Sequence, residues 1–382
     1  MTKNFISLKS VTTAFCLASS VLGYAQSSTD AVSFEDVKLK EAILKAYPTV
    51  DANKDGEISF EEAQKVTIIR LADPVGNKDI VSAKGIEAFI NLTNFTLVNS
   101  KLTSIDVSQL TKLSVLNLKQ NQIAGALDVS MLTELSNLEL TSNQLTQLLL
   151  PKQDKLRFIY LNDNLLTELD ASQLPKLSTL NIVRNQLNTI NLSGNQSLLR
   201  LHLDSNQLQS LDLTGLSKLN WLNVDNNQLT TLGFKGNTAL KSIFLKNNTA
   251  LSSLDFQNGD AENISILNVE GSTSLTTILK DCNDALPATL PASIDVKDNC
   301  GNLSLASVSS NSFSVYPNPT TEKLYIQTEH RIIDIKLFDE LGQNIPIQWS
   351  DGTVNVKHLN RGLYWLQIQT EHGSIIHKVV KK

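Results

Sequence analysis

The chain has 382 residues, of which 41% are apolar and 5% aromatic, and a formal net charge of -5 at pH 7. This is an ordinary globular composition. The absence of a basic excess removes the electrostatic basis for nucleic-acid binding, so we expect no nucleic-acid partner.

Residues 1–25 have the pattern of a cleaved secretory signal peptide. Lys3 and Lys9 give a positive start, residues 11–22 are mostly apolar or small, and Gly23-Tyr24-Ala25 places small residues where a signal peptidase cleaves. The alternative is a transmembrane anchor, but the apolar run is too short to span a bilayer. We expect an exported protein with no transmembrane segment after signal removal.

The next motif, Asp51 to Glu62 (DANKDGEISFEE), follows a predicted amphipathic helix at residues 34–47. It matches the helix-loop-helix calcium loop of EF-hands at every diagnostic position, with Gly56 at the sharp turn. Calcium prefers such hard oxygen ligands. The predicted calcium ligands are Asp51, Asn53, Asp55, Glu57 through its backbone carbonyl, Ser59 and Glu62.

The alternative is a solvated Asp-Gly turn that binds no metal. Regulatory loops usually come in pairs, whereas this loop is single, so we expect a structural calcium ion. A second helix is predicted from about Phe60. Residues 34–71 would then form a small helical cap, stiffened by calcium, over the end of the array that follows.

Residues 72–281 contain a repeated pattern, L-x-x-L-x-L-x-x-N-x-L-x-x-L-x-L. Its first position recurs in steps of 21 or 22 residues, and of 24 at the last step. Alternating leucines predict short strands with one buried face, and self-similarity at this period indicates a solenoid. A buried asparagine column is expected to bond backbone groups where the chain leaves each strand. Its members are Asn121, Asn143, Asn164, Asn185, Asn206, Asn227 and Asn248.

The repeats resemble those of leucine-rich repeat proteins, in a 21-residue bacterial form with two near-equivalent halves. The resemblance implies a mainly β repeat protein, a right-handed solenoid with a parallel sheet on one face and short strands on the other. Extra residues at Ala124–Ala126 and after Asn248 are expected to bulge its outer surface.

Outward positions of the predicted strands carry large aromatic and charged side chains that the leucine frame does not require. Aromatic and arginine residues on one face are the usual anchors of a binding patch. The alternative is that the aromatic residues stack on one another to stabilise the sheet. The predicted ligand-binding residues are Phe158, Tyr160, Arg184, Arg200, His202, Trp221 and Phe244.

An extracellular protein or glycan is the expected partner of this surface. Trp and Tyr suit sugar stacking, while Arg with Asp suits protein contacts. We expect no enzyme, because G-x-S-x-G, H-E-x-x-H, phosphate-loop and C-x-x-C motifs are all missing from the sequence. Two other hypotheses stay open: a surface-layer or matrix component that self-associates, and an accessory subunit of a hydrolase.

Cys282 and Cys300 lie in a predicted C-terminal cap, residues 282–301. In an oxidising compartment a disulfide between them is plausible; the alternative is two reduced thiols. A Ser-rich linker follows at residues 302–311. Residues 312–382 then show short alternating strands separated by turns, which predict a small antiparallel β-sandwich.

The C-terminal module resembles the type A sorting domain of type IX secretion. The resemblance rests on Val315-Tyr316-Pro317-Asn318-Pro319, Leu337-Phe338-Asp339 with Gly342-Gln343, Gly362-Leu363-Tyr364 and Lys378-Val379-Val380-Lys381. It implies contact with the type IX machinery and export across the outer membrane of a Gram-negative bacterium, followed by release or attachment to the surface. The alternative is a generic binding sandwich. Trp365 stands where such domains more often carry a smaller apolar residue.

Overall fold

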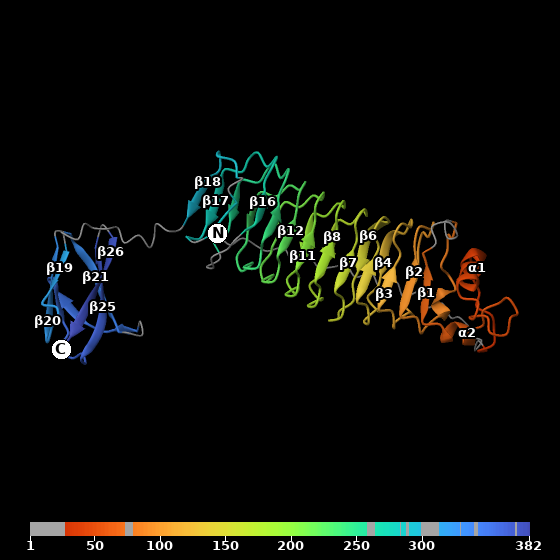
Figure 1. Cartoon of the computed structure of the whole chain (residues 1–382), viewed down its shortest axis with the longest axis horizontal. Coiled ribbons are helices and arrows are strands. Elements are labelled where there is room, and N and C mark those ends of the chain that lie inside the picture. The colour runs from red at the N-terminus through yellow and green to blue at the C-terminus, as the bar shows by residue number, and fades with distance from the viewer. Residues whose placement is uncertain are drawn as a thin grey trace, which may run out of the picture. The chain divides into compact units, whose positions relative to one another are not determined.

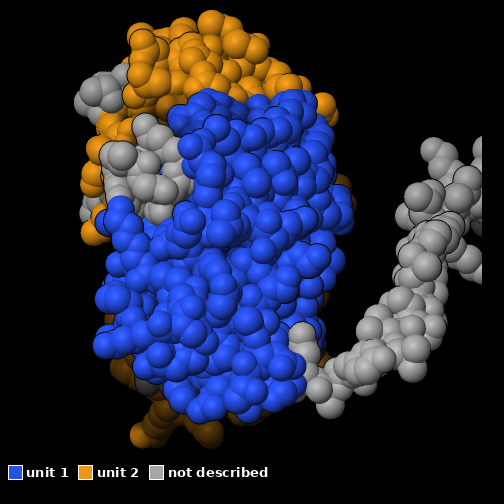
Figure 2. Space-filling view, turned by 90° about the vertical axis from the view of Figure 1, so that its right-hand side faces the viewer, with its two compact units in different colours: residues 1–208 blue, residues 209–382 orange. Residues whose placement is uncertain are grey.

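The computed structural model describes residues 27–72, 79–257, 264–282, 284–287, 290–298, 313–328, 330–339, 343–370 and 373–382. The predicted signal peptide, the linker and Cys300 lie outside the described residues. The chain divides into two compact units, Met1–Leu208 and Gln209–Lys382 (Figure 2), which we call unit 1 and unit 2.

Unit 1 begins with two short helices, α1 (Val37–Ala46) and α2 (Phe60–Lys65). The Asp36 side chain caps α1 by accepting a hydrogen bond from the Lys38 N–H, and Leu39 and Ile43 bury its apolar face. At α2, Ser59 and Glu62 form a capping box, in which each side chain bonds the backbone N–H of the other. Strand β1 (Ile68–Leu71) follows, and a single 3-10 turn, η1, spans Ile86–Ala88.

The parallel sheet of unit 1 is built from the first strand of each repeat (Figure 1). A buried aliphatic residue at the centre of each three-residue strand alternates with outward neighbours, as in Leu138, Ile159 and Leu180. The predicted inward and outward positions are therefore confirmed. In sheet order the strands are β1, β2 (Asn94–Leu97), β3 (Val115–Asn117), β5 (Asn137–Glu139), β7 (Phe158–Tyr160), β9 (Thr179–Asn181) and β11 (Arg200–His202).

The second half of the repeats forms short strands too, as predicted. In unit 1, β4 (Ala124–Asp128) pairs with β6 (Gln144–Leu149), and β8 (Glu168–Asp170) pairs with β10 (Thr189–Asn191). The register of β4 shifts between Gly125 and Ala126, which is the expected irregularity at the extra residues.

The asparagine column forms the predicted ladder. Asn164 Nδ2 donates to Leu140 O and Leu161 O in two successive repeats, and its Oδ1 accepts from Leu145 N. The residue before each ladder asparagine adopts a left-handed backbone, with φ between 52° and 59° at Gln120, Ser142, Asp163, Arg184, Ser205, Asn226 and Asn247. The ladder thus satisfies the backbone groups that this sharp turn leaves without strand partners.

Unit 2 continues the repeat pattern with β12 (Trp221–Asn223), β14 (Ser242–Phe244) and β16 (Ile266–Asn268), which pair in parallel. The second strands, β13 (Thr231–Gly233), β15 (Ser253–Asp255), β17 (Thr277–Lys280) and β18 (Asp295–Asp298), make another parallel sheet. Buried Phe234 and Phe256 stack with ring centroids 4.4 Å apart. Cys282 is disulfide-bonded.

The C-terminal module is an antiparallel β-sandwich, as predicted. One sheet contains β19 (Phe313–Tyr316), β20 (Lys323–Thr328), β24 (Thr353–Asn355) and β23 (Gln348–Ser350). The other contains β22 (Asn344–Ile345), β21 (Ile332–Phe338), β25 (Gly362–Thr370) and β26 (Gly373–Lys381). Both sheets contribute buried side chains to one core, including Leu324, Val354, Leu337 and Leu366. Trp365 is 40% exposed, so the core does not have to accommodate its large side chain.

Among the residues that the structure describes, no helix has the length and apolar character needed to cross a membrane.

Candidate functional site

Four of the predicted ligand-binding residues lie on strands β7 and β11 of unit 1. The strand register places Tyr160, Asn181 and His202 in one outward row, and Phe158, Thr179 and Arg200 in the row beside it. Adjacent strands are about 4.8 Å apart, so side chains two strands apart are separated by about 10 Å. The predicted aromatic, imidazole and guanidinium groups therefore share one small surface.

The electrostatics of this surface follow from partial burial. Burial lowers the pKa of His202, and the positive charge of Arg200 lowers it further. Neutral imidazole, with one donor and one acceptor nitrogen, is therefore the form at pH 7. Burial raises the pKa of Asp204, against the opposing effects of a backbone hydrogen bond and Arg184.

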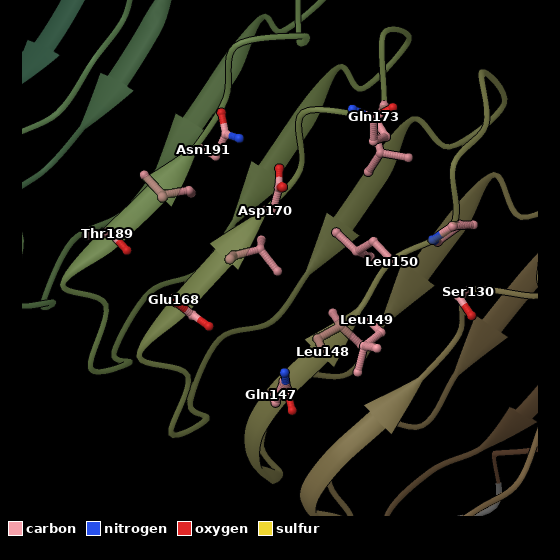
Figure 3. A pocket seen from close by; sticks show the side chains of 14 residues that line it. Ser130, Gln147, Leu148, Leu149, Leu150, Glu168, Asp170, Gln173, Thr189 and Asn191 are labelled. Atoms are coloured by element: carbon pink, nitrogen blue, oxygen red, sulfur yellow. The ribbon is translucent and has the colours of Figure 1, made fainter. Parts of the chain in front are cut away.

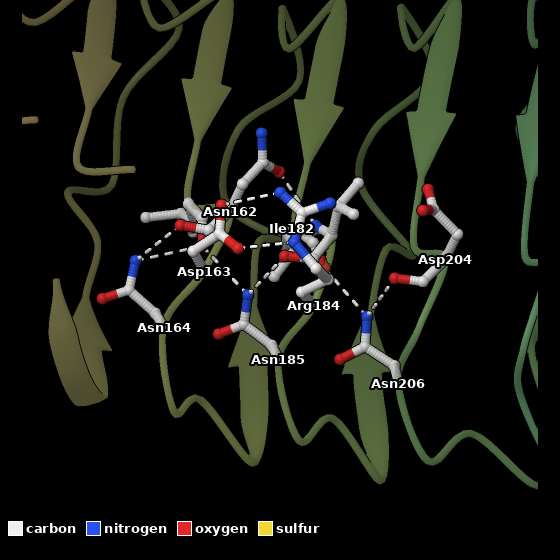
Figure 4. Close-up of polar contacts among 10 residues, drawn as sticks. Asn162, Asp163, Asn164, Ile182, Arg184, Asn185, Asp204 and Asn206 are labelled. Atoms are coloured by element: carbon white, nitrogen blue, oxygen red, sulfur yellow. Dashed lines mark hydrogen bonds and ion pairs between the residues drawn. The ribbon is translucent and has the colours of Figure 1, made fainter. Parts of the chain in front are cut away.

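Arg184 is placed differently from the strand residues, at the left-handed turn position before Asn185. Asp163 occupies the same position one repeat earlier, and Arg184 donates to it from both Nε and Nη2, the latter over 2.8 Å (Figure 4). The hydrogen bond from Arg184 lowers the pKa of Asp163. Arg184 thus reaches the surface as half of an exposed, bidentate ion pair.

Trp221 and Phe244 lie together in unit 2. Their ring centroids are 5.0 Å apart, and the ring planes are tilted by 35°. Ser242 lies directly opposite Trp221 across the β12–β14 pair and is buried. This small residue leaves room for Phe244, two positions along β14, to pack against the indole. This ring packing is the arrangement expected if the aromatic residues stack on one another to stabilise the sheet. Both rings are also partly exposed to solvent.

The predicted calcium loop is organised by its own side chains. Asp51 accepts hydrogen bonds from Asp55 N and Gly56 N, Asn53 accepts from Asp55 N, and Asp55 accepts from Glu57 N. Gly56 has a φ of 83°, which its lack of a Cβ makes accessible. The oxygens at positions one, three and five therefore point into the loop.

The Glu62 carboxylate closes the loop by accepting hydrogen bonds from backbone N–H groups of other loop residues. Its Oε1 accepts from Ala52 N at 2.8 Å, and its Oε2 accepts from the backbone N and the hydroxyl of Ser59, both at 2.8 Å. Burial opposes ionisation of Glu62, but the hydrogen bonds from Ser59, Ala52 and Asn53 outweigh it and lower its pKa.

The loop fits calcium by the type of its oxygen donors and by its turn. The Glu62 carboxylate, however, is directed at backbone N–H groups rather than gathered with the other acids. Across the described residues, no group of three or more His, Cys, Asp and Glu side chains is placed to hold a metal ion.

Sequence reasoning missed two features. The left-handed backbone conformation of the residue before each ladder asparagine was not predicted. The sequence feature that could have indicated it is the mostly polar character of these residues. A groove on the second strands, at Leu148–Pro151, was also missed (Figure 3). Its signal is a departure from the repeat, where Leu149 and Pro151 occupy the positions of Asp170 and Ser172 in the next repeat.

The chain was compared with known protein families, curated proteins and solved structures. Residues 314–382 match the family of secretion system C-terminal sorting domains. Among solved structures, the chain is similar to the functional domain of InlJ from Listeria monocytogenes (19% identity, 85% of this chain and 93% of that chain, TM-score 0.41). It is also similar to InlP from the same organism (16% identity, 91% and 97%, TM-score 0.42) and to a leucine-rich-repeat protein of Leptospira interrogans (24% identity, 63% and 74%, TM-score 0.44). A search of curated proteins found no match.

The fold is thus a parallel β-solenoid of leucine-rich repeats followed by a sorting domain, and the sorting domain identifies a secreted protein. The sorting domain engages the type IX secretion machinery. Export by this route ends in release or in attachment to the outer-membrane surface.

Proposed function

We propose that the exported solenoid is a non-enzymatic binding protein that holds an extracellular protein or glycan on the outward face of its parallel strands. The observation that supports this most strongly is the row arrangement of Phe158, Tyr160, Arg200 and His202 in unit 1. Phe158 is 38% exposed, although the buried leucine frame is complete without it. Rigid aromatic side chains next to arginine are typical anchors of a binding patch.

Both partner classes fit the chemistry of this surface. Tyr160 can stack on a sugar ring, and neutral His202 can hydrogen-bond its hydroxyl groups. Arg200 and the Asp163–Arg184 pair suit the polar rim of a protein interface. On a protein held at the outer-membrane surface, binding of either kind would produce adhesion.

The test is binding of the purified full chain to a glycan array and to a panel of purified surface proteins. Tyr160→Ala should weaken binding to any hit at least about tenfold, equivalent to about 1.4 kcal/mol. The urea midpoint of unfolding should stay unchanged. Asn117→Ala is a matched control, because Asn117 has the same outward position on β3 as Tyr160 on β7.

Unchanged binding in Tyr160→Ala would contradict the proposal, and so would a large loss of stability, which would indicate a structural role. Trp221→Ala tests unit 2 separately, where stacking on Phe244 predicts a stability loss as well. Solution scattering of the same samples distinguishes the alternative of a self-associating surface layer, whose apparent mass would rise with protein concentration.

We also propose a structural calcium ion held by Asp51, Asn53, Asp55, the carbonyl of Glu57, Ser59 and Glu62. With an extracellular-type affinity of about 0.5 mM, 10 mM calcium would stabilise the protein by about 1.8 kcal/mol. Thermal melts with and without calcium measure this shift. Glu62→Gln should abolish it, whereas Glu61→Gln, which removes an exposed acid next to it, should not. An equal melting temperature with and without calcium would refute the site.

The predicted Cys282–Cys300 disulfide remains part of this proposal. Its support is that Cys282 is disulfide-bonded. Two thiols that can be alkylated in the native protein would contradict the pairing.

A further inference from the structure

The two outward faces of the C-terminal sandwich differ in chemistry. Strand residues of a sandwich alternate between the shared core and solvent, so the outward positions are expected to be polar. The sheet of β19, β20, β24 and β23 follows this expectation, apart from Tyr316 and Tyr325, whose ring centroids are 5.9 Å apart. Its other outward residues with described side chains are Ser314, Lys323, Gln327, Gln348, Ser350, Thr353 and Asn355.

The sheet of β22, β21, β25 and β26 presents apolar side chains on its outward side. We call these residues the apolar face: Phe338, Leu363, Trp365, Ile376 and Val380. Trp365 is central, because the register places it directly opposite Phe338 on β21 and Lys378 on β26. Ile376 is 55% exposed and Val380 is 36% exposed. Grouped exposed apolar side chains of this kind mark an interaction surface.

Two of the sequence motifs of the sorting domain meet at the apolar face. The antiparallel pairing of β25 with β26 places Leu363 opposite Val380 and Tyr364 opposite Val379. Tyr364 and Val379 point inward and are buried in the sandwich core. Leu363 and Val380 alternate with them and point outward. The core therefore accounts for only the inward half of each motif.

Polar groups border the apolar face. Lys378 is exposed and, among the described residues, forms no ion pair, whereas Lys336 Nζ lies 3.7 Å from the Asp334 carboxylate. Gln367 lies between Lys336 and Ile376 across the three strands. A lipid surface would desolvate the Gln367 amide without offering it a partner, whereas a protein can supply both a donor and an acceptor. The lysines favour a partner with an acidic rim.

We propose that the apolar face is the surface by which the sorting domain docks on the type IX secretion machinery. Its occupant is a protein surface that is apolar at the centre and acidic at the rim. The engagement of this machinery by the sorting domain identifies the occupant. A central aromatic anchor with charges at the edge is the arrangement typical of a protein interface. This docking surface is separate from the ligand surface proposed for the solenoid.

The test follows export of the full chain in a Gram-negative host that has a type IX system. Trp365→Ser should lower the share of protein at the cell surface and in the medium about tenfold, with accumulation in the periplasm. Tyr325→Ser is the matched control, because it removes an exposed aromatic ring from the outward side of the other sheet, and export should stay within about twofold.

Charge reversal provides a second variant. Lys378→Glu should lower export at least about fivefold, because it places an acid opposite the acidic rim of the partner. Lys323→Glu, at an exposed outward position of β20, should export like the wild type. Urea unfolding of the purified full chains checks that the sorting domain stays folded. If Trp365→Ser unfolds it, Lys378→Glu decides, since the Lys378 side chain lies outside the core.

Three results would overturn the proposal. The first is export of Lys378→Glu, or of folded Trp365→Ser, at the wild-type level. The second is an equal loss of export in Tyr325→Ser. The third is cosedimentation of the full chain with vesicles of phosphatidylethanolamine and phosphatidylglycerol that Trp365→Ser abolishes, which would make a lipid surface the occupant. Ligand binding by the solenoid is measured separately, so its failure would leave this docking surface untouched.

Discussion

The asparagine ladder makes the strongest prediction for stability, and Asn185→Ala tests it. Asn185 Nδ2 donates to Leu161 O at 2.9 Å and to Val183 O at 3.3 Å, and its Oδ1 accepts from Leu166 N at 3.1 Å. The residue is 8% exposed, so water does not replace these bonds freely. Leaving the Leu166 N–H without a partner costs about 2 kcal/mol, whereas the Leu161 carbonyl still accepts a hydrogen bond from Asn164 Nδ2. We therefore expect a loss of about 2 kcal/mol.

Urea unfolding followed by circular dichroism measures this loss. Gln186→Ala is the matched control, because Gln186 is the exposed neighbour in the same turn, and its change should stay within about 0.5 kcal/mol. The dependence of the unfolding free energy on urea must be the same in both variants, since a repeat protein can lose cooperativity. A loss below about 1 kcal/mol for Asn185→Ala would refute the view that the ladder satisfies buried backbone groups.

Three further predictions follow from the same structure. Arg184→Ala should change the unfolding free energy by less than about 1 kcal/mol, because its ion pair with Asp163 is exposed, and urea unfolding checks this. Gly194→Ala should destabilise the protein by about 2 kcal/mol in the same assay, because a Cβ there would collide with Ser172 O. The lowered pKa of Glu62 contributes stability that is fully present above the pKa of the unfolded chain and is lost as pH falls through the folded pKa. Unfolding midpoints should therefore fall more steeply below about pH 4.5 in the wild type than in Glu62→Gln, which has no carboxylate to protonate.

The scaffold could be predicted because its residues repeat. Leucine at fixed spacing determines which side of each strand is buried, and one asparagine per turn can be satisfied only in a stack. The left-handed turn column could not be predicted in this way. Gln120, Ser142, Asp163 and Arg184 share a backbone conformation but no side-chain type, so residue identity carries little signal there.

The candidate surface was predictable in part. Strand periodicity alone assigns Tyr160 and His202 to the outward rows. The repeat length also places Arg184 one turn after Asp163, but their pairing depends on a turn geometry that the pattern does not encode. For Trp221, the decisive factor is the small size of Ser242 opposite it, which leaves room for a ring from the neighbouring strand.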